Sequence, residues 1–257
     1  MTRLTDAFKN KKAFIPFVTA GDPDLSTTEA LIYAMEEAGA SVIELGIPFS
    51  DPVAEGPVIQ EADNRALAAG FRIDALFELL EKVREKTEIP LVFLTYANPI
   101  FTYGREAFFT RCAKASIDGV IVPDVPFEER ATLLPFAREK GIALISLIAP
   151  TSHERVQMLA REAEGYIYLV SSMGVTGVRE KITTDLKEIV EKIREVSNQP
   201  VAVGFGIARP EQAAQMADIS DGAIVGSAIV KLVAKYGKTA VGPVRDYVLS
   251  MVEAVRV

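Results

Sequence analysis

The chain has 257 residues, of which 49% are hydrophobic and 25% charged, and its formal net charge is −7. This acidic balance disfavours nucleic acid as a partner, because proteins that bind it concentrate positive charge. Charged residues interrupt the apolar runs, so no stretch has the ~20 apolar residues of a membrane span, and the expected location is the cytoplasm. The single cysteine, Cys112, has no partner for an internal disulfide.

Short apolar runs alternate along the chain with segments of helical periodicity. After a short helical segment at 2–9, strands are predicted at 14–19, 42–45, 90–95, 119–122, 142–148, 166–170, 201–204 and 222–225. Helices are predicted at 25–38, 58–69, 72–86, 105–115, 128–140, 185–197, from the residues after 150 to 162, from 210 onward and after 226. Runs that are apolar on both faces are typical of parallel strands covered by helices.

Eight such units predict an α/β protein, a (β/α)8 TIM barrel in one domain over 1–257 with a short N-terminal helix. A doubly wound open sheet would usually stop at five to seven strands. Binding sites of barrels lie in the loops that follow the strands, so the search for functional residues begins there.

An acidic residue, Glu44, stands in the second predicted strand between Ile43 and Leu45. It is either a strand-end acid that pairs with a backbone group or a lysine, or a catalytic acid/base. Burial in an apolar pocket would raise its pKa toward neutrality, and we favour catalysis. The loop that follows adds Asp51 and Glu55; each alone is typical of a solvated turn, while together with Glu44 they indicate paired carboxylates at a strand end.

Glycines follow the last two predicted strands, in the run 204–206 and at Gly226, which precedes Ser227. Backbone N–H groups at such loops and at helix starts bind anions, and this position in a barrel is typical of a phosphate site. The predicted phosphate cradle has no lysine. The loop at 174–177 could close over the same place.

Several chemistries are disfavoured by what the chain does not contain. His153 is the only histidine, and a surface or helix-capping role suits it; a zinc site would need more N or S donors, so no metal is expected. No lysine lies in a predicted strand or at its last residue, which disfavours a Schiff base. Carboxylate acid/base chemistry on a phosphorylated, partly apolar small molecule remains, and the residues available to line an apolar pocket are Phe17, Leu94, Ile121 and Tyr168.

Seven runs together resemble the tryptophan synthase alpha subunit family over nearly the whole chain. They are PFVTAGDP (16–23), ELGIPFSDP (44–52), YANPI (96–100), PDVPFEE (123–129), GVTG (174–177), GFGI (204–207) and GSAIV (226–230). The resemblance implies a barrel that cleaves indole-3-glycerol phosphate to indole and glyceraldehyde 3-phosphate in a retro-aldol reaction, with no cofactor of its own.

By the same resemblance, Glu44 matches the catalytic glutamate, which takes the glycerol hydroxyl proton and protonates the indole ring carbon. Glu55 falls at the second catalytic acid, an aspartate in the family, whose motif ends ADGP where this chain has AEGP. The extra methylene keeps the charge and moves it by about 1.5 Å, a displacement that can cost a large rate factor. The positions matched to substrate binding are Phe17, Leu94, Ile121, Tyr168, Thr176, Gly177, Phe205, Gly206, Gly226 and Ser227.

The resemblance also implies a partner, a pyridoxal-phosphate beta subunit, in an alpha2beta2 complex, with Pro48, Asp51, Asn98 and Phe101 at the interface. The sequence predicts an exposed apolar docking face from loop residues Pro48, Phe49, Pro99, Ile100 and Phe101. The alternative interpretation of these residues is packing within the barrel.

Two other functions fit the same barrel. A phosphosugar isomerase or epimerase would share the phosphate loops, but it would not need so apolar a pocket and would more often use histidine or a metal. A barrel that only regulates a partner would explain Glu55 as a sign of lost activity.

Overall fold

The structure, a computed structural model, describes residues 2–150, 153–171, 179–204 and 206–256. The described strands are all paired in parallel. They are β1 (Ala13–Thr19), β2 (Ile43–Gly46), β3 (Leu91–Leu94), β4 (Gly119–Ile121), β5 (Ala143–Leu144), β6 (Ser146–Ile148), β7 (Ile167–Val170), β8 (Val201–Gly204) and β9 (Gly222–Val225). The prediction of a (β/α)8 barrel is confirmed.

The barrel closes at its fifth predicted strand, which is broken in two. The strand order is β5-β4-β3-β2-β1-β9-β8-β7-β6, so the two ends of the series are consecutive in sequence and only Ile145 separates them. The N–H of Ile145 donates to the carbonyl of Val120 at 3.0 Å, while β6 pairs with β7. The prediction of one strand at 142–148 is therefore wrong in detail.

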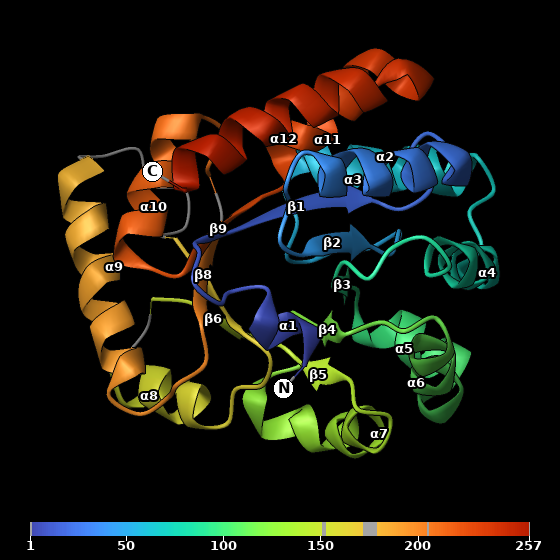
Figure 1. The fold of residues 1–257 in the computed structure, drawn as a ribbon. Helices are drawn as coiled ribbons and strands as arrows, with labels where there is room; N and C mark the ends of the chain where they lie inside the picture. The colour runs from blue at the N-terminus through green and yellow to red at the C-terminus, as the bar shows by residue number, and fades with distance from the viewer. Residues whose placement is uncertain (1, 151–152, 172–178, 205, 257) are drawn as a thin grey trace.

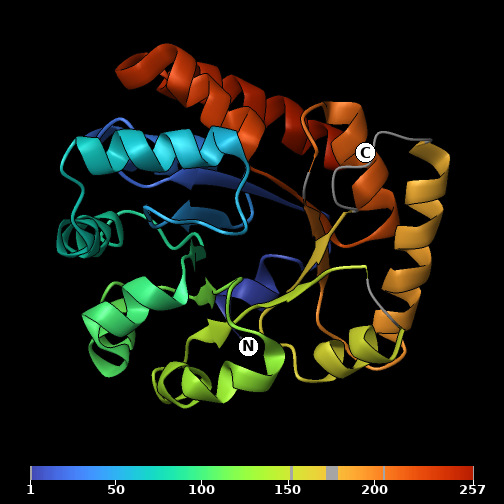
Figure 2. The same ribbon diagram turned by 180° about the vertical axis from the view of Figure 1, so that it is seen from behind.

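Helices surround the strands on the outside (Figures 1 and 2). They are α1 (Arg3–Asp6), α2 (Leu25–Glu37), α3 (Pro57–Ala68), α4 (Ile73–Val83), α5 (Ala97–Tyr103), α6 (Arg105–Lys114), α7 (Leu134–Glu139), α8 (His153–Arg161), α9 (Arg179–Arg194), α10 (Pro210–Ile219), α11 (Ser227–Tyr236) and α12 (Val241–Val255), with 3₁₀ helices η1 (Phe127–Thr132) and η2 (Gly237–Thr239).

Three helix predictions need correction. The segment 128–140 forms η1 and then α7, and Pro135 suits the first turn of α7 because its missing N–H costs nothing there. No helix was predicted where α5 forms, and the helix predicted from 185 already begins at Arg179. The cap of α2 is Asp24, whose carboxylate accepts the N–H of Thr27 at 2.7 Å.

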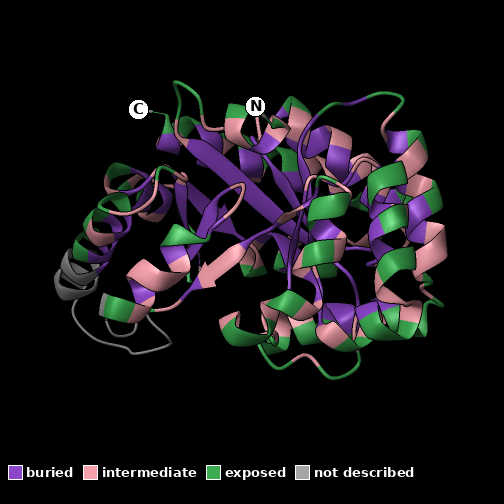
Figure 3. Ribbon diagram, turned by 90° about the horizontal axis from the view of Figure 1, so that it is seen from below, coloured by how far each residue is buried: buried purple, intermediate pink, exposed green. Residues whose placement is uncertain are grey.

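The core has two layers, because successive strand residues face opposite sides of the sheet. Ile43 and Leu45 face the helices and belong to the outer layer. The inner layer fills the barrel and includes Tyr166. Helix α1 closes one end of the barrel: Leu4 belongs to the inner layer, and the ring of Phe8 lies 5.7 Å from that of Tyr166. Figure 3 shows buried residues concentrated in the strands and exposed ones on the outer helix faces.

Among the described residues, no helix combines the length and apolar character that a membrane span requires.

The pairing of β1 with β9 gives a prediction about barrel packing. Gly222 lies opposite Ala13, and a Cβ at position 222 would lie 2.5 Å from the Ala13 carbonyl oxygen. Because backbone must move to accommodate it, Gly222→Ala should lower the free energy of unfolding by about 1–3 kcal/mol in urea denaturation. The control is Gly242→Ala in α12, where no atom lies within 4 Å of the added Cβ; we expect unchanged or slightly higher stability. Equal stability of both variants would contradict the prediction.

Candidate active site

A cavity of about 350 Å³ is lined by residues of β1, β2, β3, β7 and β9 and of the loops that follow strands. It is lined by Phe17, Glu44, Ala54, Glu55, Gly56, Ile59, Leu94, Tyr168, Gly206, Ile207, Ala208, Ile224, Gly226, Ser227, Ala228 and Lys231. The two carboxylates and the glycine loops predicted from the sequence therefore share one cavity.

Glu44 occupies the inner face of β2, with its backbone opposite Phe17 of β1 and Val92 of β3. Only 1% of the residue is exposed. The hydroxyl of Tyr166 donates to Glu44 Oε1 at 2.5 Å. Burial raises the pKa of Glu44 to about 8, against the opposing effect of this hydrogen bond. A carboxyl with such a pKa can give and take a proton near neutral pH.

The partner of Glu44 is thus a phenol, and neither a backbone group nor a lysine. Tyr166 is itself fully buried, and burial raises the pKa of its hydroxyl well above the ordinary value, so it stays a neutral donor. In the sequence, Tyr166 stands two residues before Tyr168. Because residues two apart on a strand face the same side of a sheet, this spacing places both tyrosines on the inner face.

Glu55 reaches the cavity from the loop between β2 and α3. Its Oε2 is buried and has no hydrogen-bond partner among the described residues. Burial raises the pKa of Glu55. The Tyr96 hydroxyl accepts the N–H of Ala54 at 3.2 Å, which ties the loop to the start of α5. The interpretation of Glu55 as a solvated turn residue is therefore wrong.

Asp51, the other acid of this loop, does not line the cavity. It is exposed and its carboxylate accepts the Ser50 hydroxyl at 2.5 Å. For Asp51 the structure agrees with the solvated-turn interpretation.

The glycine end of the cavity has space for an anion. Gly206 has a φ of +74° and no atom lies within 4 Å of where a Cβ would be, so its backbone is open to a ligand. Gly226 caps α11, and Ser227 is the first residue of that helix, whose N-terminus favours negative charge. Lys231 also lines the cavity. Sequence analysis missed it, although it follows Ser227 by four residues and so shares its helix face.

Phe17, Leu94 and Tyr168 form apolar walls as predicted. The ring of Tyr168 depends on Gly204 beside it, because a Cβ there would lie within 2.4 Å of the Tyr168 hydroxyl oxygen. Ile121 is fully buried in the inner layer and is not among the lining residues. Three predicted residues, Thr176, Gly177 and Phe205, lie outside the described part of the chain.

The predicted docking face is only partly exposed. Asp51 and Asn98 are exposed, and so is Phe101, at 48%. Pro48 and Ile100 are instead buried, because their side chains pack inward beneath the loops. Val53, which the sequence analysis did not single out, is 79% exposed.

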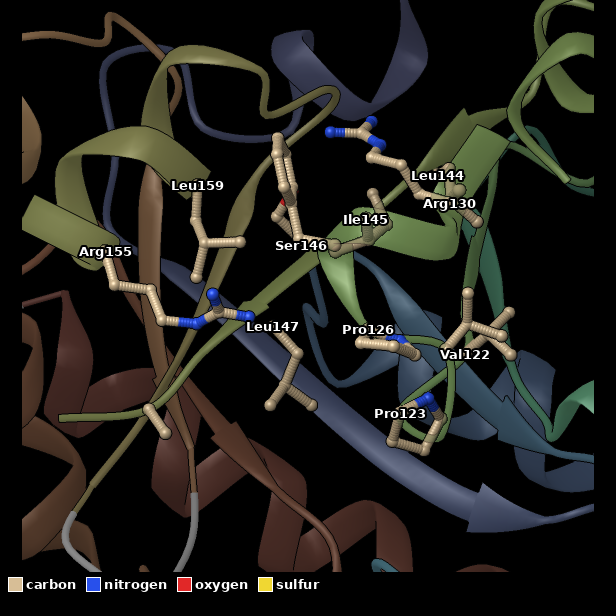
Figure 4. Close-up of a pocket in the computed structure, with 13 residues that line it drawn as sticks. Val122, Pro123, Pro126, Arg130, Leu144, Ile145, Ser146, Leu147, Arg155 and Leu159 are labelled. Atoms are coloured by element: carbon tan, nitrogen blue, oxygen red, sulfur yellow. The ribbon is translucent and has the colours of Figure 1, made fainter. Parts of the chain in front are cut away.

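A second cavity, of about 200 Å³, lies between η1, β6 and α8 (Figure 4). Arg130 and Arg155 reach toward it from different elements. Arg155 forms a two-point ion pair with Glu128, and Arg130 donates to the carbonyl of Glu162 at 3.0 Å. None of its described lining residues is Asp, Glu or His, so it offers no acid/base group.

The described residues contain no group of three or more His, Cys, Asp or Glu side chains suited to a metal ion.

Comparison with known proteins gives one consistent result. The family model "Tryptophan synthase alpha chain" matches residues 4–253. Two curated relatives of that name are from Lacticaseibacillus casei, 50% identical with 96% of this chain and 93% of the relative covered, and Lactiplantibacillus plantarum, 52% identical with 98% and 95% covered.

Two solved structures agree with this result. Tryptophan synthase subunit alpha from Legionella pneumophila has a TM-score of 0.90 at 35% identity, with 99% of this chain and 98% of that chain covered. A chain of the tryptophan synthase a2b2 complex from Pyrococcus furiosus has a TM-score of 0.87 at 36% identity, with 95% and 99% covered.

The bond between Tyr166 and Glu44 predicts a pKa change. Because the bond stabilises the carboxylate, Tyr166→Phe should raise the pKa of Glu44 further above 8, as measured by carbon-13 NMR of labelled glutamate carboxyls. Tyr168→Phe is the control: this inward tyrosine of the same sheet region feels the charge of Glu44, but no described hydrogen bond joins the two. An unchanged Glu44 pKa in Tyr166→Phe would show that the bond does not tune it.

Proposed function

The chain belongs to the tryptophan synthase alpha chain family, and we propose that Glu44 and Glu55 perform the acid–base chemistry of its reaction. It is a carbon–carbon lyase of tryptophan biosynthesis, which cleaves indole-3-glycerol phosphate to indole and glyceraldehyde 3-phosphate. The observation that carries the proposal is the burial of Glu44 in the cavity wall, which raises the pKa of its carboxyl to about 8.

Glu44 accounts for both proton transfers. In its neutral form it gives a proton to the indole ring carbon that bears the glycerol chain. The resulting carboxylate then takes the proton of the glycerol hydroxyl as the carbon–carbon bond breaks, and the bond electrons return to the indole ring. The aldehyde and indole leave, and Glu44 is again neutral. A pKa near the operating pH serves both steps.

Glu55 would contact the indole ring nitrogen, and the glycine loops of the cavity would contact the phosphate. A Glu55 carboxylate beside the indole N–H would stabilise the positive charge that develops on the ring when its carbon is protonated. Gly206, Gly226 and Ser227 would bind the phosphate at the start of α11, with Lys231 adding positive charge. Phe17, Leu94 and Tyr168 would pack the indole between them.

The cavity also bears on the alternative functions. An isomerase would not need the apolar walls, and a barrel that only regulates would not need to retain both carboxylates in one cavity. Thr176, Gly177 and Phe205 are proposed as substrate contacts from the family resemblance alone.

The partner is the tryptophan synthase beta subunit, as in the a2b2 complex of the Pyrococcus furiosus neighbour. We propose that Asp51, Asn98 and Phe101 contact it, with exposed Val53 beside them. Buried Pro48 would shape the loop beneath that surface. We also propose that the whole chain acts as one domain, since its described strands belong to one nine-stranded sheet, and that it works in the cytoplasm.

Substitution of Glu44 tests the central assignment. Glu44→Gln keeps the shape and the acceptor for Tyr166 but cannot exchange a proton, so indole formation from indole-3-glycerol phosphate should fall by at least about 100-fold, alone and with a beta subunit, while substrate still binds. Near-normal turnover would refute the role. No indole from the unsubstituted chain in either mixture would refute the lyase activity itself.

The same variant has a stability consequence. The folded-state pKa of Glu44, about 8, exceeds the ordinary value of 4.5. The neutral carboxyl therefore contributes stability that is complete below about pH 4 and is lost as the pH rises toward 8. Glu44→Gln should remove this part of the pH dependence in urea unfolding.

Substitution of Glu55 tests the second carboxylate. Glu55→Gln preserves the length of the side chain and removes its charge, so kcat should fall by about 10²–10³-fold with a smaller change in KM. The matched control is Asp51→Asn, an exposed acid of the same loop, with kcat of the isolated chain unchanged. If Glu55→Gln retains wild-type kcat, the negative charge at position 55 has no catalytic role.

A further inference from the structure

The loop between β8 and α10 carries part of the phosphate end of the cavity. Three of its residues, Gly206, Ile207 and Ala208, line the cavity, and α10 begins shortly after them at Pro210. None of the three lies in a strand or helix, so no regular backbone pairing holds them. The position of this loop therefore depends on the side chains that bond its backbone.

Two outer helices bond the backbone of Ala208. The Tyr247 hydroxyl of α12 donates to the Ala208 carbonyl at 3.0 Å. The N–H of Ala208 donates to Gln212 Oε1 of α10 at 3.0 Å, and the same oxygen accepts the N–H of Arg209 at 3.1 Å. Both backbone polar groups of Ala208 are thus satisfied by side chains, and neither Tyr247 nor Gln212 lines the cavity.

The two residues before Ala208 have the opposite character. The N–H groups of Gly206 and Ile207 donate to no acceptor among the described residues. Gly206 has a φ of +74° and open space where a side chain would be, while the Ile207 side chain belongs to the outer core layer. Successive backbone N–H groups in a turn form a concave site for an anion. The loop therefore has donors available to a ligand beside a residue that is bonded to the helices.

Both bonding side chains stand on well-packed helices. Helix α12 packs against α10 and α2 outside the barrel (Figure 1), and its residues Val244 and Val248, on either side of Tyr247, are fully buried. Tyr247 is half-buried, and burial raises the pKa of its hydroxyl to about 12, so it remains a donor at neutral pH. Gln212 stands next to the buried Ala213 on α10. Packing of the two helices therefore fixes the groups that bond the loop.

We propose that Tyr247 and Gln212 are positioning residues of the phosphate site: they hold Ala208 so that the backbone of Gly206 and Ile207 faces the substrate phosphate. The inference rests on the proposed phosphate contact of this loop and adds what keeps the loop in place. The phosphate is not attached to either carbon of the bond that breaks, so loss of one of these hydrogen bonds weakens substrate binding and leaves the chemical step intact. The last helix of the chain thus takes part in substrate binding without contacting the substrate.

Removal of either side-chain group should raise KM and leave kcat. Tyr247→Phe deletes only the hydroxyl and keeps the packed ring, and Gln212→Ala deletes the shared acceptor. Each should raise the KM for indole-3-glycerol phosphate about 3–10-fold, with kcat within about twofold of wild type. The matched controls are Tyr236→Phe on α11 and Gln215→Ala on α10, both exposed, with both constants unchanged. A wild-type KM in either Tyr247→Phe or Gln212→Ala would overturn the proposal.

Binding measurements separate loop positioning from a general loosening of the cavity. Glycerol 3-phosphate probes the phosphate end and indole probes the apolar end, each titrated by calorimetry in the absence of turnover. Tyr247→Phe and Gln212→Ala should each weaken the binding of glycerol 3-phosphate about 3–10-fold and leave the Kd for indole unchanged. Equal weakening of both probes would overturn the proposal, since a merely structural defect affects the whole cavity.

The same titrations distinguish this proposal from the lyase assignment. If the wild type forms indole from its substrate while Tyr247→Phe binds glycerol 3-phosphate normally, only the positioning role is refuted. If the wild type binds glycerol 3-phosphate more tightly than Tyr247→Phe but forms no indole, alone or with a beta subunit, the positioning role stands and the lyase activity is refuted. A wild type that binds no glycerol 3-phosphate would overturn the phosphate site and the positioning role together.

Discussion

The structure depends on one carboxyl group held inside the barrel. Glu44 is costly to bury as an anion, and the barrel reduces that cost by keeping it neutral and by giving it the Tyr166 hydroxyl at 2.5 Å. Tyr166 is in turn packed by Phe8, next to α1, at the closed end of the barrel. The inner layer therefore fills the barrel and also sets the pKa of Glu44. The same contacts thus affect both the stability of the fold and proton transfer.

Glu44 could be predicted from the sequence because a charge within an apolar strand is conspicuous. The barrel could be predicted because eight apolar runs alternate with helical patterns. The break at Ile145 could not, since an apolar residue at a closing seam looks like any strand residue. Tyr166 could not be paired with Glu44 either, because the two residues stand on strands that only the fold brings together.

The anion end of the cavity reconciles a chain of net charge −7 with a phosphorylated substrate. Overall charge repels an anion only weakly at the distances where salt screens, whereas the contacts at Gly206 and the start of α11 act at hydrogen-bond range. Lys231 lies one turn into the same helix and adds a local positive charge. Attraction is therefore confined to one end of the cavity, which leaves the acids at the other end in an apolar setting that keeps their pKa values high.

The two acids are controlled in different ways, and the difference links the active site to the docking surface. Glu44 is fixed within a strand, where burial and the hydrogen bond from Tyr166 set its protonation. Glu55 lies on a loop, which the N–H of Ala54 ties to the Tyr96 hydroxyl. The same loop exposes Val53, two residues before Glu55. A subunit that contacted Val53 would therefore act on the loop that carries Glu55, while Glu44 stays fixed in the barrel wall.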